Sequence, residues 1–155
     1  MHPDMVIRQA GVADAGEILT LQRAAYATEA QRYGDPHLPA LTQSLTDLEA
    51  ELADGYAWVA TVGSRMVGAV RVTLRGVTAH VGRLVVAPDL HGRGIGTALM
   101  QHVHRDPPAG ATRFELFTGH LSAGNLRLYK RLGYVECSRS ALTPDVELVY
   151  LDRSA

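Results

Sequence analysis

The stretch GRLVVAPDLHGRGIGTAL, residues 82–99, constrains this chain more than any other segment. It joins a run of strand-forming residues to the start of a helix through a proline and three glycines, which are Pro88, Gly92, Gly94 and Gly96. Glycine tolerates positive φ and lets a ligand approach the main chain, while the first N–H groups of a helix have no acceptor within it. A glycine loop before a helix start is typical of phosphate and pyrophosphate sites. A simple chain reversal needs only one or two glycines, so the stretch predicts a phosphate-bearing ligand.

The spacing of these glycines separates the nucleotide folds that use such loops. A P-loop requires Gly-Lys followed by Ser or Thr, whereas Gly96 is followed directly by Thr97. The dinucleotide pattern G-x-G-x-x-G needs glycine at position 97 or 99, and Thr97 and Leu99 stand there. The loop therefore excludes a standard nucleotide triphosphatase and leaves an NAD-dependent oxidoreductase as a weakly supported alternative.

The order of patterns along residues 1–155 predicts one α/β domain, because this length suits a single domain of common size. Period-2 and helical spacings predict strands at 5–10, 56–62, 66–74, 77–88, 112–119, 134–142 and 146–153, and helices at 14–33, 44–52, 95–104 and 122–132. Residues 34–44 contain two prolines and are expected to form a loop. This order predicts a mixed sheet with an antiparallel meander and helices on both faces.

Charge and composition limit the classes of partner and of site that we expect for this chain. The formal charge is -1 and the chain has no block of basic residues, so nucleic acid and anionic membranes are not expected as partners. No apolar run approaches the ~20 residues of a spanning helix, and we expect a cytoplasmic protein. Cys137 is the only cysteine, which excludes an internal disulfide, and we expect it to be a small apolar filler in a strand. His102 and His104 lie on different faces of a helix, so no metal site is expected.

Two motifs, HGRGIG at residues 91–96 and SAGNLRLYKRLGYVE at residues 122–136, follow each other along the chain. Together they resemble the GNAT family of N-acetyltransferases. In that family Arg/Gln-x-x-Gly-x-Gly/Ala after a strand binds the pyrophosphate of acetyl-coenzyme A, and His91 takes the Arg/Gln position here. The second motif matches the family through Leu128, Tyr129, Gly133 and Tyr134. The resemblance covers nearly the whole chain and implies an α/β GNAT-type fold, with a mixed, mostly antiparallel twisted sheet flanked by helices on both faces.

The resemblance also implies acetyl-coenzyme A as cosubstrate. The strand backbone would pair with the pantetheine amides, and the glycine loop would hold the pyrophosphate; the residues implied are Leu84, Val85, Val86, His91, Gly92, Arg93, Gly94, Gly96 and Thr97. The N–H of Val85 or Val86 is the candidate donor to the oxyanion. Either Ser122 or Asn125 would contact the pantetheine arm or a phosphate, although Ser122 also suits an ordinary helix cap.

Amine acetylation requires a proton acceptor and a proton donor. An alkyl amine with a pKa of about 10.4 is neutral only about once in 10³ molecules at pH 7, and only that form attacks a thioester. A hydroxyl near the sulfur assists departure of the thiolate, and the resemblance assigns this role to Tyr129. His80 matches the position where many relatives carry a glutamate base, and its ordinary pKa near 6.5 suits proton abstraction. His120 and Glu115 are the alternative bases.

The acceptor is expected at the variable first half of the chain, which flanks the acceptor cleft in the family. The residues expected near it are Tyr26, Glu29, Tyr33, His37, Leu38, Arg71 and His120. The predicted activity is acetyl transfer to the amine of a small molecule or peptide by direct attack in a ternary complex. The alternative is a non-catalytic acyl-coenzyme A sensor or interaction module on the same fold. A homodimer through the two C-terminal strands is a further expectation.

Overall fold

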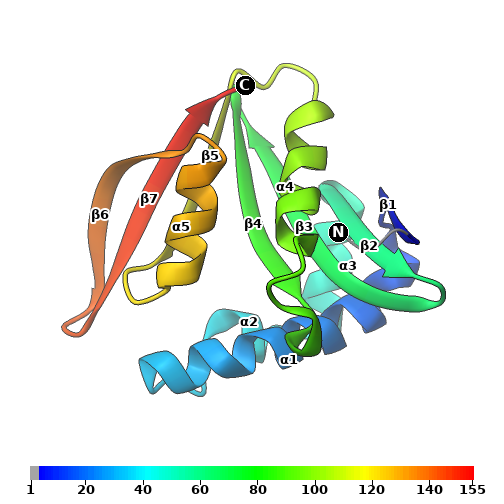
Figure 1. Cartoon of the computed structure of the whole chain (residues 1–155), viewed down its shortest axis with the longest axis horizontal. Coiled ribbons are helices and arrows are strands. Elements are labelled where there is room, and N and C mark those ends of the chain that lie inside the picture. The colour runs from blue at the N-terminus through cyan, green and yellow to red at the C-terminus, as the bar shows by residue number, and fades with distance from the viewer. Residues whose placement is uncertain (1–3) are drawn as a thin grey trace.

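A seven-stranded sheet in the order β1-β2-β3-β4-β5-β7-β6 organises the computed structural model, which describes residues 4–155 (Figure 1). The strands are β1 Met5–Gln9, β2 Tyr56–Val62, β3 Arg65–Arg75, β4 Thr78–Val86, β5 Arg113–Gly119, β6 Val135–Thr143 and β7 Val146–Ser154. Every neighbouring pair is antiparallel except β4 and β5, which are parallel. The expected mixed, mostly antiparallel sheet is confirmed.

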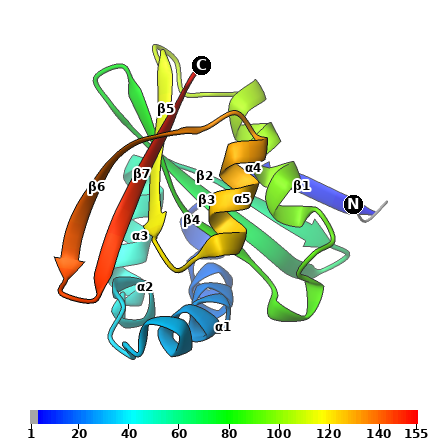
Figure 2. The same cartoon turned by 60° about the vertical axis from the view of Figure 1, so that its left-hand side comes forward.

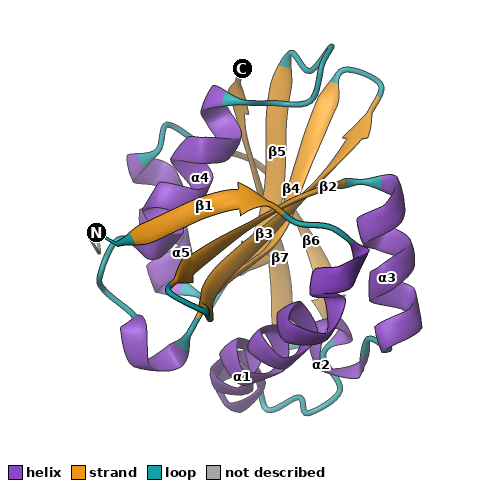
Figure 3. Cartoon of the chain, turned by 90° about the vertical axis from the view of Figure 1, so that its right-hand side faces the viewer, coloured by secondary structure: helices purple, strands orange, loops and turns teal. Residues whose placement is uncertain are grey.

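Helices cover both faces of this sheet (Figure 3). They are α1 Ala15–Tyr33, α2 Pro39–Thr42, α3 Leu45–Asp54, α4 Ile95–Arg105 and α5 Ala123–Arg131, with 3-10 turns η1 Val12–Asp14 and η2 Pro88–Leu90. The expectation of a loop throughout residues 34–44 is wrong in part, because α2 lies within it. Pro39 is the first residue of α2, a position at which the missing N–H of proline breaks no helical hydrogen bond.

The core consists of two apolar layers, one on each face of the sheet. Side chains alternate along a strand, so Val70 and Val72 of β3 join the layer beneath α4 and α5, while Ala69 joins the layer beneath α1 and α3. Leu99 of α4 is fully buried in the first layer and Leu48 of α3 in the second. These layers hold the start of α4 beside the end of β4.

The sheet opens between β4 and β5. The two strands pair only through residues 78–80 of β4 and 113–115 of β5. Beyond this point β4 follows β3, pairing Val86 with Gly68, and β5 follows β7, pairing Gly119 with Leu148. Figure 1 shows the two halves of the sheet diverging from this junction. The second half of β4 therefore has a free edge toward β5.

A β-bulge lies where β4 leaves β5. Arg71 pairs with Gly82 and Ala69 with Val85, so β4 holds one more residue than β3 over this interval. Arg83 occupies the bulge with φ 52°, and it is the one non-glycine residue with positive φ in residues 4–155.

The position of Cys137 in the edge strand β6 corrects the expectation that this residue is an apolar filler. This cysteine does lie in a strand, but its side chain is exposed and its thiol donates to the carbonyl of Tyr150. β6 is the last strand of the sheet and all nine of its residues are exposed, so Cys137 fills no core space. In the described part of the chain, every helix is too short or too polar to cross a bilayer.

Candidate active site

The opening between β4 and β5 leads into a cleft of about 1050 Å³. Its walls are α1, the segment containing α2, the second half of β4, the glycine loop, α5 and the β6–β7 hairpin. Figure 2 shows the far end of that hairpin on the same side of the molecule as α1 and α2. Many of the residues expected from the sequence meet here, namely Tyr26, Glu29, Tyr33, Leu38, Leu84, Val85, Val86, His91, Gly92, Gly94, Gly96, Thr97, Ser122, Asn125 and Tyr129.

The backbone of β4 presents hydrogen-bonding groups to this cleft. The N–H of Ala87 donates to the carbonyl of Val67, 2.9 Å away on the β3 side. Successive residues of a strand direct their N–H and C=O groups to opposite edges, so those of Val86 and Leu84 point into the gap. Of the two N–H groups considered as oxyanion donors, this geometry favours Val86, because the N–H of Val85 faces β3.

The glycine loop adds unpaired amides at one end of the cleft. Gly92 and Gly94 adopt φ values of 76° and 81°, the left-handed conformation that favours glycine. The first hydrogen bond of α4 runs from Ala98 N–H to the carbonyl of Gly94, so the amides of residues 95–97 have no acceptor within the helix. This end of the cleft suits an anion such as a pyrophosphate.

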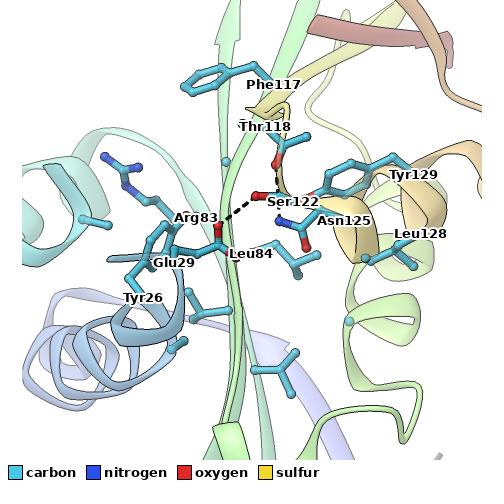
Figure 4. A pocket seen from close by; sticks show the side chains of 18 of the residues that line it. Tyr26, Glu29, Arg83, Leu84, Phe117, Thr118, Ser122, Asn125, Leu128 and Tyr129 are labelled. Carbon is cyan, nitrogen blue, oxygen red and sulfur yellow. Dashed lines mark hydrogen bonds between the residues drawn. The ribbon is translucent and has the colours of Figure 1, made fainter. Parts of the chain in front are cut away.

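Tyr129 of α5 places a protonated phenol in the cleft wall. Its side chain is 7% exposed, and Figure 4 shows it beside Ser122. Burial raises the pKa of Tyr129 well above its usual value of 10, with smaller contributions from Tyr26, Tyr134 and Glu29. The phenol therefore keeps its proton at neutral pH and can donate it.

Ser122 links α1 to the start of α5. Ser122 occupies the N-cap position of α5, as the sequence indicates, but its side chain makes no capping hydrogen bond. Its hydroxyl donates to Glu29 Oε2 at 2.8 Å and lies 2.8 Å from the hydroxyl of Tyr33, which accepts the N–H of Leu121. Because the oxygen of Tyr33 accepts from Leu121, its own hydroxyl proton is free to be donated to Ser122. Ser122 in turn donates to Glu29 (Figure 4). This network orients one oxygen of the Glu29 carboxylate, while Arg32 pairs with the other.

The three bases considered from the sequence lie outside the residues that line the cleft. His80 sits in the paired part of β4, with its Nδ1 3.6 Å from Glu115 Oε1. At about 3.3 Å per residue, His80 lies roughly 20 Å along the strand from Val86. His120 accepts the N–H of Glu147 through Nδ1, at the opposite edge of β5. These positions do not favour a catalytic role for any of the three.

Three other expected residues also lie outside the lining. His37 is exposed, and its N–H donates to the carboxylate of Asp35. Arg93 is exposed on the glycine loop and is not among the residues that line the cleft. Arg71 is buried beneath α1 and α3, where it pairs with Glu51 at 2.9 Å. Arg71 therefore supports the wall, since its charge is already neutralised.

The cleft also contains residues that the sequence interpretation omitted. Arg83, Phe117 and Thr118 line it, and Thr118 accepts a hydrogen bond from the side-chain amide of Asn125 at 3.3 Å. Phe117 is 54% exposed, although it is a large apolar residue in the middle of the sheet. Alternation along β5 could have indicated that Phe117 lies opposite the buried Phe114 and Leu116. No local pattern indicates the bulge at Arg83.

Among residues 4–155, no cluster of three or more His, Cys, Asp or Glu side chains is arranged to hold a metal ion.

Comparison with known proteins agrees with this geometry. The model of the acetyltransferase (GNAT) domain matches residues 53–136, which include the bulge, the glycine loop and Tyr129. The chain belongs to the GNAT acetyltransferase family. Its fold is similar to that of the ribosomal-protein-S18-alanine N-acetyltransferase from Escherichia coli, with a TM-score of 0.80 and 17% identity over 97% of this chain and 93% of that one.

Two further comparisons extend this GNAT assignment. The PaiA N-acetyltransferase from Thermoplasma acidophilum, solved in complex with coenzyme A, superposes with a TM-score of 0.79 and 16% identity over 94% of this chain and 97% of that one. The UPF0157 protein YqkA of Bacillus subtilis is 31% identical over 122 residues, which cover 77% of this GNAT chain. The match covers 34% of YqkA, so this chain spans about a third of the length of that relative.

Proposed function

We propose that this GNAT chain transfers the acetyl group of acetyl-coenzyme A to a primary amine by direct attack within a ternary complex. The observation that carries the proposal is the free edge of β4, which runs from the bulge to the amides of the glycine loop. Polar backbone groups left without partners in a cleft favour a ligand with matching amides and phosphates. Acetyl-coenzyme A carries both in the same order.

The cosubstrate would lie along this edge. Leu84 and Val86 would pair with the pantetheine amides, and the amides of residues 92–97 would hold the pyrophosphate. The structure supports Asn125 as the side chain that faces the pantetheine arm, because the hydroxyl of Ser122 is already bonded to Glu29 and Tyr33. His91 lines the cleft at the glycine loop and would contribute its imidazole near the phosphates.

The chemistry follows from the groups around the free edge. The carboxylate of Glu29 is bonded to Ser122 and Arg32 but keeps further lone pairs. With these it would accept the acceptor ammonium and take up its proton, which leaves a neutral amine to attack the thioester carbonyl. The new C–N bond places negative charge on the carbonyl oxygen, which the N–H of Val86 stabilises. The C–S bond then breaks, and Tyr129 donates its proton to the departing thiolate. The acylated nitrogen loses its second proton, which restores the phenol of Tyr129. Cys137 is exposed on β6 outside the cleft, which supports direct attack over an acyl-enzyme.

The Tyr129→Phe variant tests this proposal. General acid catalysis contributes about 10²- to 10⁴-fold, so we expect kcat for thiol release with an amine panel to fall by about 10²-fold. Binding of acetyl-coenzyme A, measured by calorimetry, should not change. Tyr134→Phe is the matched control, because Tyr134 is also a buried tyrosine but lies outside the cleft lining.

Two outcomes would contradict the proposal. Unchanged turnover in Tyr129→Phe would remove this residue from the proton-donor role. Binding of acetyl-coenzyme A without thiol release for any amine would favour the non-catalytic sensor. A thermal-shift comparison separates the remaining alternative, because coenzyme A should raise the unfolding temperature whereas NAD should not.

A further inference from the structure

Arg83 occupies a backbone conformation that its side chain disfavours. A non-glycine residue at φ 52° costs on the order of 1 kcal/mol relative to glycine, and such strain gathers at binding sites. The bulge directs this arginine to the lining of the cleft, on the face of the sheet that carries α1. The fold therefore holds the guanidinium of Arg83 at the point where β4 separates from β5.

The charge of Arg83 is uncompensated within residues 4–155. Its guanidinium lies over the ring of Tyr26, 5.9 Å from the centroid, and makes no hydrogen bond or ion pair with any described residue. Arg71, its neighbour across the β3–β4 ladder, differs in this respect. Arg71 is bonded to Gln22, Gln43 and Glu51, so it cannot take a ligand without breaking those bonds. Arg83 alone of the pair is available to an anion.

Arg83 lies on the wall of the cleft that also holds Glu29, the residue proposed to receive the acceptor ammonium. The guanidinium of Arg83 lies over the ring of Tyr26, which is three residues before Glu29 on α1. Side chains at this spacing share one face of a helix. Figure 4 shows Arg83, Tyr26 and Glu29 together on this wall. The cleft thus presents the cation of Arg83 and the carboxylate of Glu29 on one wall.

A group of apolar side chains also lines the cleft. Phe117 and Leu142, which are 54% and 57% exposed, line it together with Leu38, Val146 and Leu148. Exposed large apolar side chains that gather in a cleft favour an apolar ligand group.

We propose that Arg83 binds the carboxylate of the acceptor, and that the acceptor is an amine-bearing carboxylic acid with an apolar body, such as an apolar amino acid. The carboxylate accepts hydrogen bonds from the guanidinium, the ammonium faces Glu29, and the apolar side chain packs against Phe117 and Leu142. This assignment rests on the proposed acetyl transfer and names its substrate class. Planar guanidinium groups suit carboxylates because they donate two parallel hydrogen bonds.

The test compares amino acids with their amides, which keep the amine and the apolar body but lack the negative charge. Thiol release from acetyl-coenzyme A is measured with L-phenylalanine and L-leucine, and with L-phenylalaninamide and L-leucinamide. We expect Arg83→Met to lower kcat/KM for the acids by about 10- to 100-fold, the value of a charge-assisted hydrogen bond. For the amides the change should be less than about twofold. Arg75→Met is the control, because Arg75 is exposed and lies outside the cleft lining.

Two results would overturn this assignment. The unmodified protein could use the amides as well as the acids, which would show that the carboxylate is not recognised. Alternatively, Arg83→Met could lower kcat/KM equally for acids and amides, which would make Arg83 a structural residue.

A binding measurement separates this inference from the proposed function. N-acetyl-L-phenylalanine and its amide are titrated by calorimetry into the protein saturated with coenzyme A, where no turnover is needed. Arg83-dependent binding of the acid without any thiol release in the enzyme assay would contradict acetyl transfer while supporting the carboxylate site. Transfer to 2-phenylethylamine but not to amino acids, with no binding of the acid, would support the transferase and overturn the role of Arg83.

Discussion

Gly119 shows how one missing methyl group controls the site. A Cβ added at Gly119 would lie 2.0 Å from the hydroxyl of Tyr33, far inside van der Waals contact. Tyr33 reaches Leu121 and Ser122 only because this space is open. We expect Gly119→Ala to displace Tyr33 and to lower the free energy of unfolding by about 1–3 kcal/mol, measured by urea denaturation.

A second substitution checks this explanation. In a Tyr33→Ala background the added methyl group has nothing to displace, so Gly119→Ala should then cost little. An equal cost in both backgrounds would show that the clash with Tyr33 is not the cause.

For single residues, the sequence indicated which residue types lie near the ligands but not which hydrogen-bond partners they have. Tyr33, Glu29 and Ser122 were expected near the ligands, and all three line the cleft. Their hydrogen bonds join residues 89 and 93 positions apart, which no local spacing reveals. Ser122 is the N-cap residue of α5, but the local pattern did not reveal that its hydroxyl bonds a carboxylate from another helix instead of capping α5.

The contact between α4 and β3 depends on Gly68. A Cβ at Gly68 would lie 2.8 Å from Leu99 Cδ1 and 2.9 Å from Ile95 Cγ2, both on α4. Because α4 begins at the glycine loop, we expect Gly68→Ala to shift the loop away from β4. The expected result is a loss of about 1–3 kcal/mol in unfolding free energy, with weaker coenzyme A binding by calorimetry.

Gly16→Ala is the matched control for this prediction. Gly16 lies in the first turn of α1, where an added Cβ meets nothing within 4 Å. Alanine there should leave the unfolding free energy unchanged or raise it slightly, because alanine favours a helix. Unaltered coenzyme A affinity in Gly68→Ala would show that the loop does not depend on this packing.

Elements with long periodic patterns were predicted well from the sequence. The seven strands and the four longer helices occur where alternation and helical spacing placed them, within a few residues. The short helix α2 was missed because four residues provide too little periodicity to distinguish a helix from a loop.

A half-buried histidine, His104, connects three segments of the molecule. His104 of α4 accepts a hydrogen bond from Arg153 of β7 at Nδ1, so its Nε2 carries the proton that bonds the hydroxyl of Tyr134 before β6. Burial, followed by the charge of Arg153, lowers the pKa of His104 from 6.5 to about 4.

This lowered pKa predicts how stability depends on pH. Above pH 6.5 the histidine is neutral in both the folded and unfolded states, and its contribution is complete. Between pH 6.5 and about 4 only the unfolded state takes up the proton, so the unfolding free energy falls by up to about 3 kcal/mol. Urea denaturation from pH 7.5 to 4 should show this loss, and His104→Gln should reduce it. His37→Gln, at an exposed histidine, should leave the pH dependence intact.

The sequence by itself determined the order of elements, the glycine loop before α4 and the position of Tyr129, because these depend on local periodicity and on backbone freedom at glycine. Only the tertiary structure decided which side chains share the cleft. His80 was excluded from its lining and Arg83 was included because the bulge and the divergence of β4 from β5 set where each residue of β4 points. That divergence arises from packing between distant elements, so it has no signature in the residues of β4 alone.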